Sequence, residues 1–126
     1  MLNDAIKVTG ELRITLTNPE GNIKQEVVVP NLVVTVGKNY IASRMKDATA
    51  TAMTHMEVGT GTTAAAAGDT TLQTAVASSR VTLTSTTVTT NNVAYVATFP
   101  AGTGTGALTE AGIFNASSSG TMLCRT

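Results

Sequence analysis

Side chains that carry chemistry are scarce in this sequence. Its 126 residues include one cysteine, Cys124, one histidine, His55, and no tryptophan. A single thiol cannot form a disulfide within the chain, and a metal site needs several converging histidine, cysteine or carboxylate ligands. A catalytic nucleophile needs a base and a group that orients that base, and His55 is the one histidine that could serve. We therefore predict a protein that is not an enzyme and has no catalytic, cofactor-binding or metal site.

Charged residues are few as well. Eight basic and eight acidic residues give a formal net charge of zero, and no two basic residues are adjacent. This pattern lacks the basic surface that nucleic-acid binding needs, whereas a net charge near zero favours association with other proteins. The N-terminus lacks the apolar segment of a signal peptide, and no apolar run reaches the length of a membrane span. We expect a protein made in the cytoplasm, with neither nucleic acid nor a membrane as partner.

The glycine-rich segments do not indicate nucleotide binding. A phosphate-binding loop needs the pattern G-x-x-x-x-G-K-[ST], in which backbone amides and a lysine contact the phosphates. Gly59–Asp69 and Gly102–Gly106 both lack that lysine. We interpret the two segments as loops.

Threonine is the most unusual component that is present, at 25 of the 126 positions. Threonine is β-branched, which suits a pleated strand and disfavours a helix. Hydrophobic residues make up 42% of the chain but aromatic residues only 3%, so the core must consist mostly of aliphatic side chains. The length fits one domain. We predict a single all-β domain over residues 1–126, in which residues 1–10 form an extended arm.

The first third of the chain predicts a hairpin and a helix. Apolar and polar residues alternate over Leu12–Leu16, a turn sequence follows at Asn18–Gly21, and Ile23–Val29 returns as a strand. Pro30 and Asn31 are expected to end this strand before a short buried strand, Leu32–Val36. The single predicted helix covers Gly37–Ala48, with Tyr40, Ile41, Met45 and Ala48 on the face toward the sheet.

The remainder of the chain predicts further strands. They are Met53–Val58, Val81–Thr90 with a bulge near Ser85–Thr87, Val93–Phe99, Leu108–Asn115 and Thr121–Thr126. Asn91–Asn92 is expected to take positive φ in a tight hairpin turn. Seven or eight strands with one helix favour a jelly-roll-like sandwich of two sheets, with an open barrel as the alternative. The predicted core residues are Leu12, Ile14, Leu16, Ile41, Met45, Val81, Leu83, Val93, Tyr95, Phe99 and Phe114.

Glu110 is an isolated charge in an otherwise apolar segment. It shares a strand face with Phe114, and it is expected to lie exposed at a strand edge or to pair with Arg44, Arg80 or Arg125. A second hypothesis makes it a buried or interfacial ion pair that fixes the register of a partner.

Three segments resemble small structural proteins of tailed bacteriophages. They are NLVVTVGKNYIASRM at Asn31–Met45, THMEVGTGTTAAAAGDTTLQTAVASSR at Thr54–Arg80, and VAYVATFPAGTGTGALTEAGIFNASSSGTMLCRT at Val93–Thr126. The three segments together make up 76 of the 126 residues. It implies a jelly-roll protein on the capsid exterior of the virion, which cements contacts between major capsid proteins.

The resemblance also implies partners. They are the major capsid protein and further copies of this chain, as a homodimer or homotrimer. A tail, collar or fibre component of a phage is the alternative, and a carbohydrate- or receptor-binding β-sandwich is a third hypothesis. Related proteins often continue with one more apolar strand after the ending "RT", which stands at Arg125–Thr126 here. We therefore expect either a truncated chain or a last strand that pairs with a partner.

Overall fold

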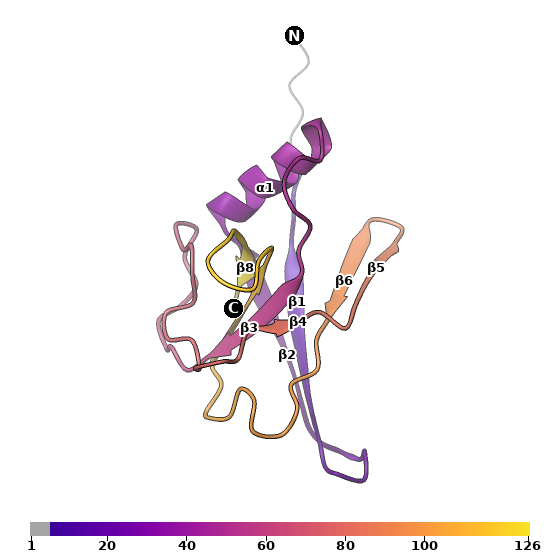
Figure 1. Ribbon diagram of the computed structural model, residues 1–126, viewed down its shortest axis with the longest axis vertical. Helices are drawn as coiled ribbons and strands as arrows, with labels where there is room; N and C mark the ends of the chain where they lie inside the picture. The colour runs from indigo at the N-terminus through magenta and orange to yellow at the C-terminus, as the bar shows by residue number, and fades with distance from the viewer. Residues whose placement is uncertain (1–5) are drawn as a thin grey trace.

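The computed structural model describes residues 6–126, which form a mostly antiparallel β protein with one helix (Figure 1). Six strands make a curled sheet in the order β1-β2-β8-β7-β3-β4, and β5 and β6 make a separate small sheet. The elements are β1 Gly10–Thr17, β2 Ile23–Val33, α1 Thr35–Lys46, β3 His55–Gly59, β4 Val81–Thr82, β5 Ser85–Thr89, β6 Asn92–Val96, β7 Glu110–Phe114 and β8 Met122–Arg125. The part of the predicted arm before residue 6 lies outside the described residues.

The β1–β2 hairpin forms where the alternating pattern predicts it. Its turn is closed by Gly21 N–H, which donates to the carbonyl of Asn18 at 2.9 Å, and Gly21 has the positive φ of 87° that glycine adopts readily. The side chain of Asn18 also accepts the N–H of Asn22 at 2.8 Å. The predicted strand end at Pro30 is wrong, because β2 continues to Val33.

The position of Pro30 explains why β2 tolerates a proline. The hydroxyl of Thr126 donates to the carbonyl oxygen of Pro30 at 2.8 Å, so this carbonyl points away from β1. Within a strand, the nitrogen and the carbonyl of one residue point to the same side, so the nitrogen of Pro30 also points away from β1. On that side β8 would be the neighbour, but β8 ends at Arg125, opposite Leu32. The missing N–H of Pro30 therefore removes no bond from the β1–β2 ladder.

Helix α1 begins two residues before the predicted start. Val34 precedes it in an extended conformation, so the predicted strand Leu32–Val36 is cut at Val33. Gly37 is buried against β8, and a Cβ there would collide with the backbone carbonyl of Leu123. The helix therefore lies close to the sheet at its first turn, whereas Met45 near its other end is 66% exposed.

The buried core is small and lies between the main sheet and the neighbouring loop. Its fully packed members are Val34, Leu72, Phe114 and Met122. Phe114 and Met122 pair across β7 and β8, and Leu72 comes from the long connection between β3 and β4. This core depends on a residue from an irregular segment, so that loop is part of the folded structure.

The predicted strand Val81–Thr90 is divided between the two sheets. Val81 and Thr82 pair with β3 in the main sheet, and the chain enters the small sheet at Ser85. The expected irregularity is therefore a change of sheet, not a bulge. In the β5–β6 turn the residue with positive φ is Thr90, at 56°. The prediction that Asn91–Asn92 would take positive φ is therefore wrong.

Burial divides the predicted core residues into three groups. Phe114 is fully buried, and half-buried positions are Leu12, Ile41, Val81, Leu83, Tyr95 and Phe99. The prediction is wrong for Ile14, Leu16, Met45 and Val93, which are 36%, 54%, 66% and 47% exposed. An alternating pattern identifies an apolar face, but whether that face is covered depends on a second layer. The described chain supplies little of that layer.

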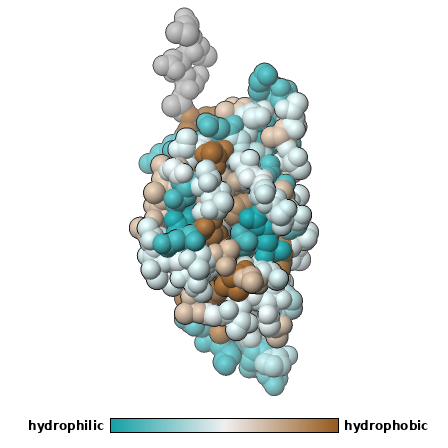
Figure 2. Space-filling view, turned by 60° about the vertical axis from the view of Figure 1, so that its left-hand side comes forward, coloured by the Kyte–Doolittle hydropathy of each residue, from teal (hydrophilic) through white to brown (hydrophobic). Residues whose placement is uncertain are grey.

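Apolar surface therefore remains open to solvent. Figure 2 shows the side that lies to the left in Figure 1, where hydrophobic areas alternate with hydrophilic ones down the middle of the surface. Within residues 6–126, no helix combines the length and the apolar character that crossing a bilayer requires.

Candidate functional site

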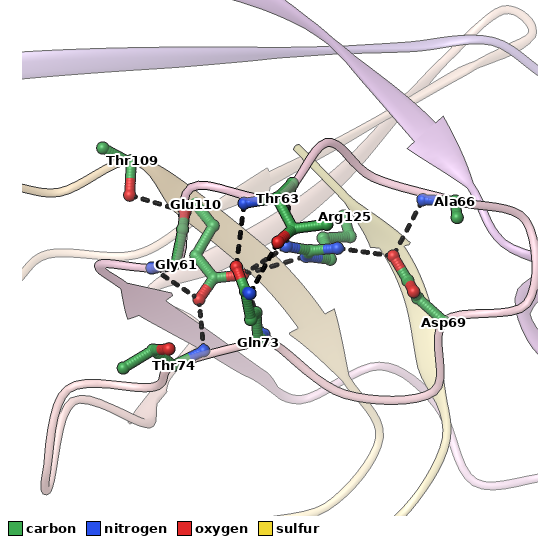
Figure 3. Close-up of polar contacts among 9 residues, drawn as sticks. All are labelled: Gly61, Thr63, Ala66, Asp69, Gln73, Thr74, Thr109, Glu110 and Arg125. Atoms are coloured by element: carbon green, nitrogen blue, oxygen red, sulfur yellow. Dashed lines mark hydrogen bonds and ion pairs between the residues drawn. The ribbon is translucent and has the colours of Figure 1, made fainter.

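The most concentrated polar cluster surrounds Glu110, the first residue of β7 (Figure 3). Glu110 pairs with Gly59 of β3 and is only 2% exposed, so the expectation of a solvent-exposed acid at a strand edge is wrong. One carboxylate oxygen accepts the backbone N–H groups of Gly61 at 3.0 Å and Thr74 at 2.7 Å. The other accepts the backbone N–H of Gln73 at 2.9 Å. Three amides from one loop therefore converge on this side chain.

Arg125, near the end of β8, supplies the opposite charge. Its Nε and Nη2 both lie 2.9 Å from Oε2 of Glu110. Its Nη1 lies 2.5 Å from Oδ2 of Asp69, and its Nη2 also donates to the carbonyl of Thr63 at 2.8 Å. Arg44, Arg80 and Arg125 were the predicted partners of Glu110, and the structure pairs it with Arg125. The pair is buried within the chain.

The electrostatics keep all three groups of the cluster ionised. Burial alone would raise the pKa of Glu110, but the hydrogen bonds from Thr74, Gln73, Arg125 and Gly61 outweigh it and lower the pKa. The backbone N–H of Ala66 and the guanidinium lower the pKa of Asp69. Burial would lower the pKa of Arg125, but its hydrogen bonds to the two carboxylates raise it.

The cluster holds the β3–β4 connection on the ends of β7 and β8. Gly59 and Gly61 allow this close approach, because a Cβ at either position would lie 2.5 Å from Oε1 of Glu110. Gln73 joins two parts of the same loop through its side-chain amide. The amide oxygen accepts the N–H of Thr63 at 2.8 Å, and the amide nitrogen donates to the hydroxyl of Thr63 at 2.6 Å. The glycines thus have a packing role in a loop.

A second cluster fixes the β7–β8 turn. Arg80 lies 2.9 Å from a carboxylate oxygen of Glu57 and stacks over the ring of Phe114 at 3.6 Å from its centroid. Its Nη1 also donates to the carbonyl of Ser119 at 2.8 Å. Ser79, which is fully buried, donates to the carbonyl of Val58 at 2.9 Å. Together these contacts connect strand β3 to the turn after β7.

An open hollow lies beside the first cluster, and the histidine lies on strand β3. Beside the cluster lies an open polar hollow of about 360 Å³, lined in part by Asp69, Thr71 and Arg125. The guanidinium there already donates to two carboxylates and a carbonyl, and these contacts use four of its five N–H groups. His55 lies on β3, with its ring nitrogens beside the hydroxyls of Thr54 and Thr82. Among residues 6–126 no group of three or more metal-ligating side chains occurs.

Sequence reasoning found Glu110 but missed its supporting residues. Gly61 and Asp69 come from the segment Gly59–Asp69, which was interpreted as a plain loop, and Gln73 follows it in the same connection between β3 and β4. A signal for Arg125 was present, because Glu110 and Arg125 are the only charged residues between Val81 and Thr126. Two isolated opposite charges in an apolar region are expected to form an ion pair.

Searches for related proteins gave no match to a family model, to a curated protein or to a solved structure.

Proposed function

We propose that the chain is a non-enzymatic structural subunit of a phage virion, which binds the outside of the capsid and cements contacts between major capsid proteins. The observation that supports this most is the surface area of the chain. It exposes 8219 Å², whereas a compact monomer of its mass, 12.9 kDa, exposes about 6,300 Å². Residues 1–5 account for at most about 740 Å² of the difference, at the accessibility of an unfolded chain.

Large apolar side chains contribute to the exposed surface, and many of them lie on strands. Side chains that are exposed include Leu16 at 54%, Ile23 at 63%, Val88 at 70% and Val96 at 47%. Surface of this kind is expected where a chain meets other proteins. The resemblance to phage virion proteins gives the partner, and it also implies a jelly-roll sandwich. In this proposal the second layer of that sandwich is completed in the assembly, where partner surfaces cover the open strands.

A cement protein must be rigid where it spans a joint. The buried cluster of Glu110, Arg125 and Asp69 serves that need, because it holds a long loop on the sheet. With a formal net charge of zero, binding depends on apolar contact more than on long-range attraction, so salt should affect it little. Each contact is modest, and many copies acting together stabilise the shell.

The test compares capsids that carry the protein with capsids stripped of it. We expect stripped capsids to release their DNA at a lower temperature, as measured by a fluorescent dye, and to recover when purified protein is added back. Equal robustness of the two capsids would contradict the proposal. The number of copies per virion separates the alternative, because hundreds of copies indicate decoration, whereas a few tens or fewer indicate a tail, collar or fibre component.

A further inference from the structure

The β5–β6 hairpin stands apart from the curled sheet and is joined to it through the chain at its base (Figure 1). Its two strands form a sheet of their own. Thr84 N–H closes the base on the carbonyl of Val96 at 2.6 Å, and we call Thr84–Val96 the arm. An isolated two-stranded hairpin is at best marginally stable in water, so contact with the rest of the chain must support the arm.

Polar contacts contribute little to that support. The arm contains no charged residue, so it cannot form an ion pair with the rest of the chain. Its two strands bond to each other over all five of their residue pairs. Within residues 6–126, the side-chain bond nearest to the arm in sequence, between Thr82 and His55, lies before its base. Among the described residues, packing therefore holds the arm in place.

A single side chain of the arm makes that packing contact. Tyr95 is the only residue of the arm that is not exposed. Val88 and Val93, a pair on the same face, remain 70% and 47% exposed. Burial raises the pKa of the Tyr95 hydroxyl, and Tyr40 and Cys124 nearby raise it further. Tyr40 belongs to α1 and Cys124 to β8, so the ring of Tyr95 lies against the body of the protein.

Beneath Tyr95 the main sheet presents an apolar face. Strand pairing places Val33 and Ile113 directly beside Cys124, and it places Met56 beside Ile113, all on this face. Val33, Met56 and Cys124 are only 6%, 8% and 5% exposed, so a second layer covers them. Tyr95 supplies that layer at the Cys124 end, and lifting the arm would uncover it.

The chain is fixed to the body on both sides of the arm. Before the arm, Leu83 N–H donates to the carbonyl of Thr54 at 2.8 Å. After the arm, Gly104 packs on β3, where an added Cβ would lie 2.8 Å from Cγ2 of Val58. Rotation of the arm is therefore confined to the short joints between these anchors and its base, as in a hinge.

We propose that the arm is a hinged lid, which opens as one unit while the main sheet stays folded and uncovers the apolar face beside Cys124. Tyr95 is the side chain that closes the lid. A unit with one half-buried contact and exposed backbone bonds belongs to the least stable part of a fold, so it opens at a smaller cost than global unfolding. This motion needs one copy of the chain and no capsid protein, and it therefore stands or falls separately from the cementing function.

The first experiment follows amide hydrogen exchange of the full chain by NMR, at a series of urea concentrations below the unfolding transition. In the wild type, amides bonded across β5 and β6 should be protected at least about a hundredfold less than those bonded across β3 and β7. Their exchange should also depend less on urea, because opening the lid exposes less surface than unfolding does. Equal protection of the two strand pairs, or an equal urea dependence, would overturn the proposal.

Substitutions then test which side chain closes the lid. Tyr95→Thr keeps a strand-forming residue but removes the ring, so protection in the arm should fall by about tenfold or more. Strands β3 and β7 should stay protected at least about a hundredfold more than the arm, because the main sheet remains folded. Tyr95→Phe keeps the ring, and it should leave protection in the arm within about threefold of the wild type.

The matched control introduces the same residue where the arm is open to solvent. Val88→Thr, at a position 70% exposed, should also change protection in the arm by no more than about threefold. No effect of Tyr95→Thr, an equal effect of Val88→Thr, or a fall of β3 and β7 to the protection of the arm would each contradict the lid.

Discussion

Replacing Arg125 by methionine should destabilise the fold severely. The substitution keeps much of the side-chain volume but leaves the Glu110 carboxylate without a counter-charge, at a side-chain exposure of 1%. Breaking a buried ion pair by removing one partner costs about 3–5 kcal/mol. The loss is a large part of the stability of a small domain, about 5–15 kcal/mol in total.

The assay is urea unfolding followed by far-ultraviolet circular dichroism, at one fixed protein concentration because association adds to stability. With a urea dependence of about 2 kcal/mol per molar, the midpoint should fall by about 1.5–2.5 M without a change of slope. The matched control is Arg13→Met, which removes an ion pair whose arginine is 62% exposed and should cost about 0–1 kcal/mol.

A double variant separates the ion pair from simple packing. In Glu110→Gln/Arg125→Met no full negative charge is left at position 110, so stability should recover partly relative to Arg125→Met alone. If Arg125→Met costs no more than Arg13→Met, the cluster does not hold the loop as described. If the double variant is as unstable as the sum of its single changes, the two residues do not act as a pair.

Three further predictions concern the same region and the core. Gly61→Ala should lower the free energy of unfolding in urea by about 1–3 kcal/mol, because its Cβ would lie 2.5 Å from a Glu110 oxygen. The control Gly68→Ala, where an added Cβ meets nothing within 4 Å, should change that free energy by less than about 0.5 kcal/mol. Equal effects of the two substitutions would refute the close approach at Gly61. The folded-state pKa values of Glu110 and Asp69 lie below the ordinary 4.5 and 3.8. The stability that the two carboxylates contribute is therefore complete above pH 4.5 and is lost as the pH falls through the lowered values. In a variant with Gln and Asn at these positions, the free energy of unfolding should fall less steeply at acid pH. Burial raises the pKa of Cys124 to about 11, so a thiol reagent at pH 8 should react only after unfolding, and rapid labelling of the folded protein would contradict this.

Local patterns explain what the sequence could predict about the fold. The hairpin of β1 and β2 follows from alternation over Leu12–Leu16 and from turn residues at Asn18–Gly21, which act within a few positions of each other. The helix was placed to within two residues for the same reason. Pro30 misled the prediction because its effect depends on which side its nitrogen faces, and that side is set by the distant β8.

The candidate site shows the corresponding limit. Glu110 was identified from its isolation in an uncharged segment, but its environment comes from Gly61, Gln73 and Thr74, which lie far away along the chain. No local pattern connects a glycine-rich loop to a strand so distant in sequence. Only the antiparallel pairing of β3 with β7, Gly59 opposite Glu110, brings the loop over the carboxylate.

The sequence by itself determined the β-rich class, the first hairpin, the position of the helix and the shortage of charge, because each depends on composition or on neighbouring residues. Tertiary structure decided which apolar faces are covered. Phe114 and Leu16 both stand in strand patterns, yet one is fully buried and the other is 54% exposed. The physical reason is that burial is a property of what packs against a face, and long-range strand pairing places that layer over β7 but not over the end of the β1–β2 hairpin.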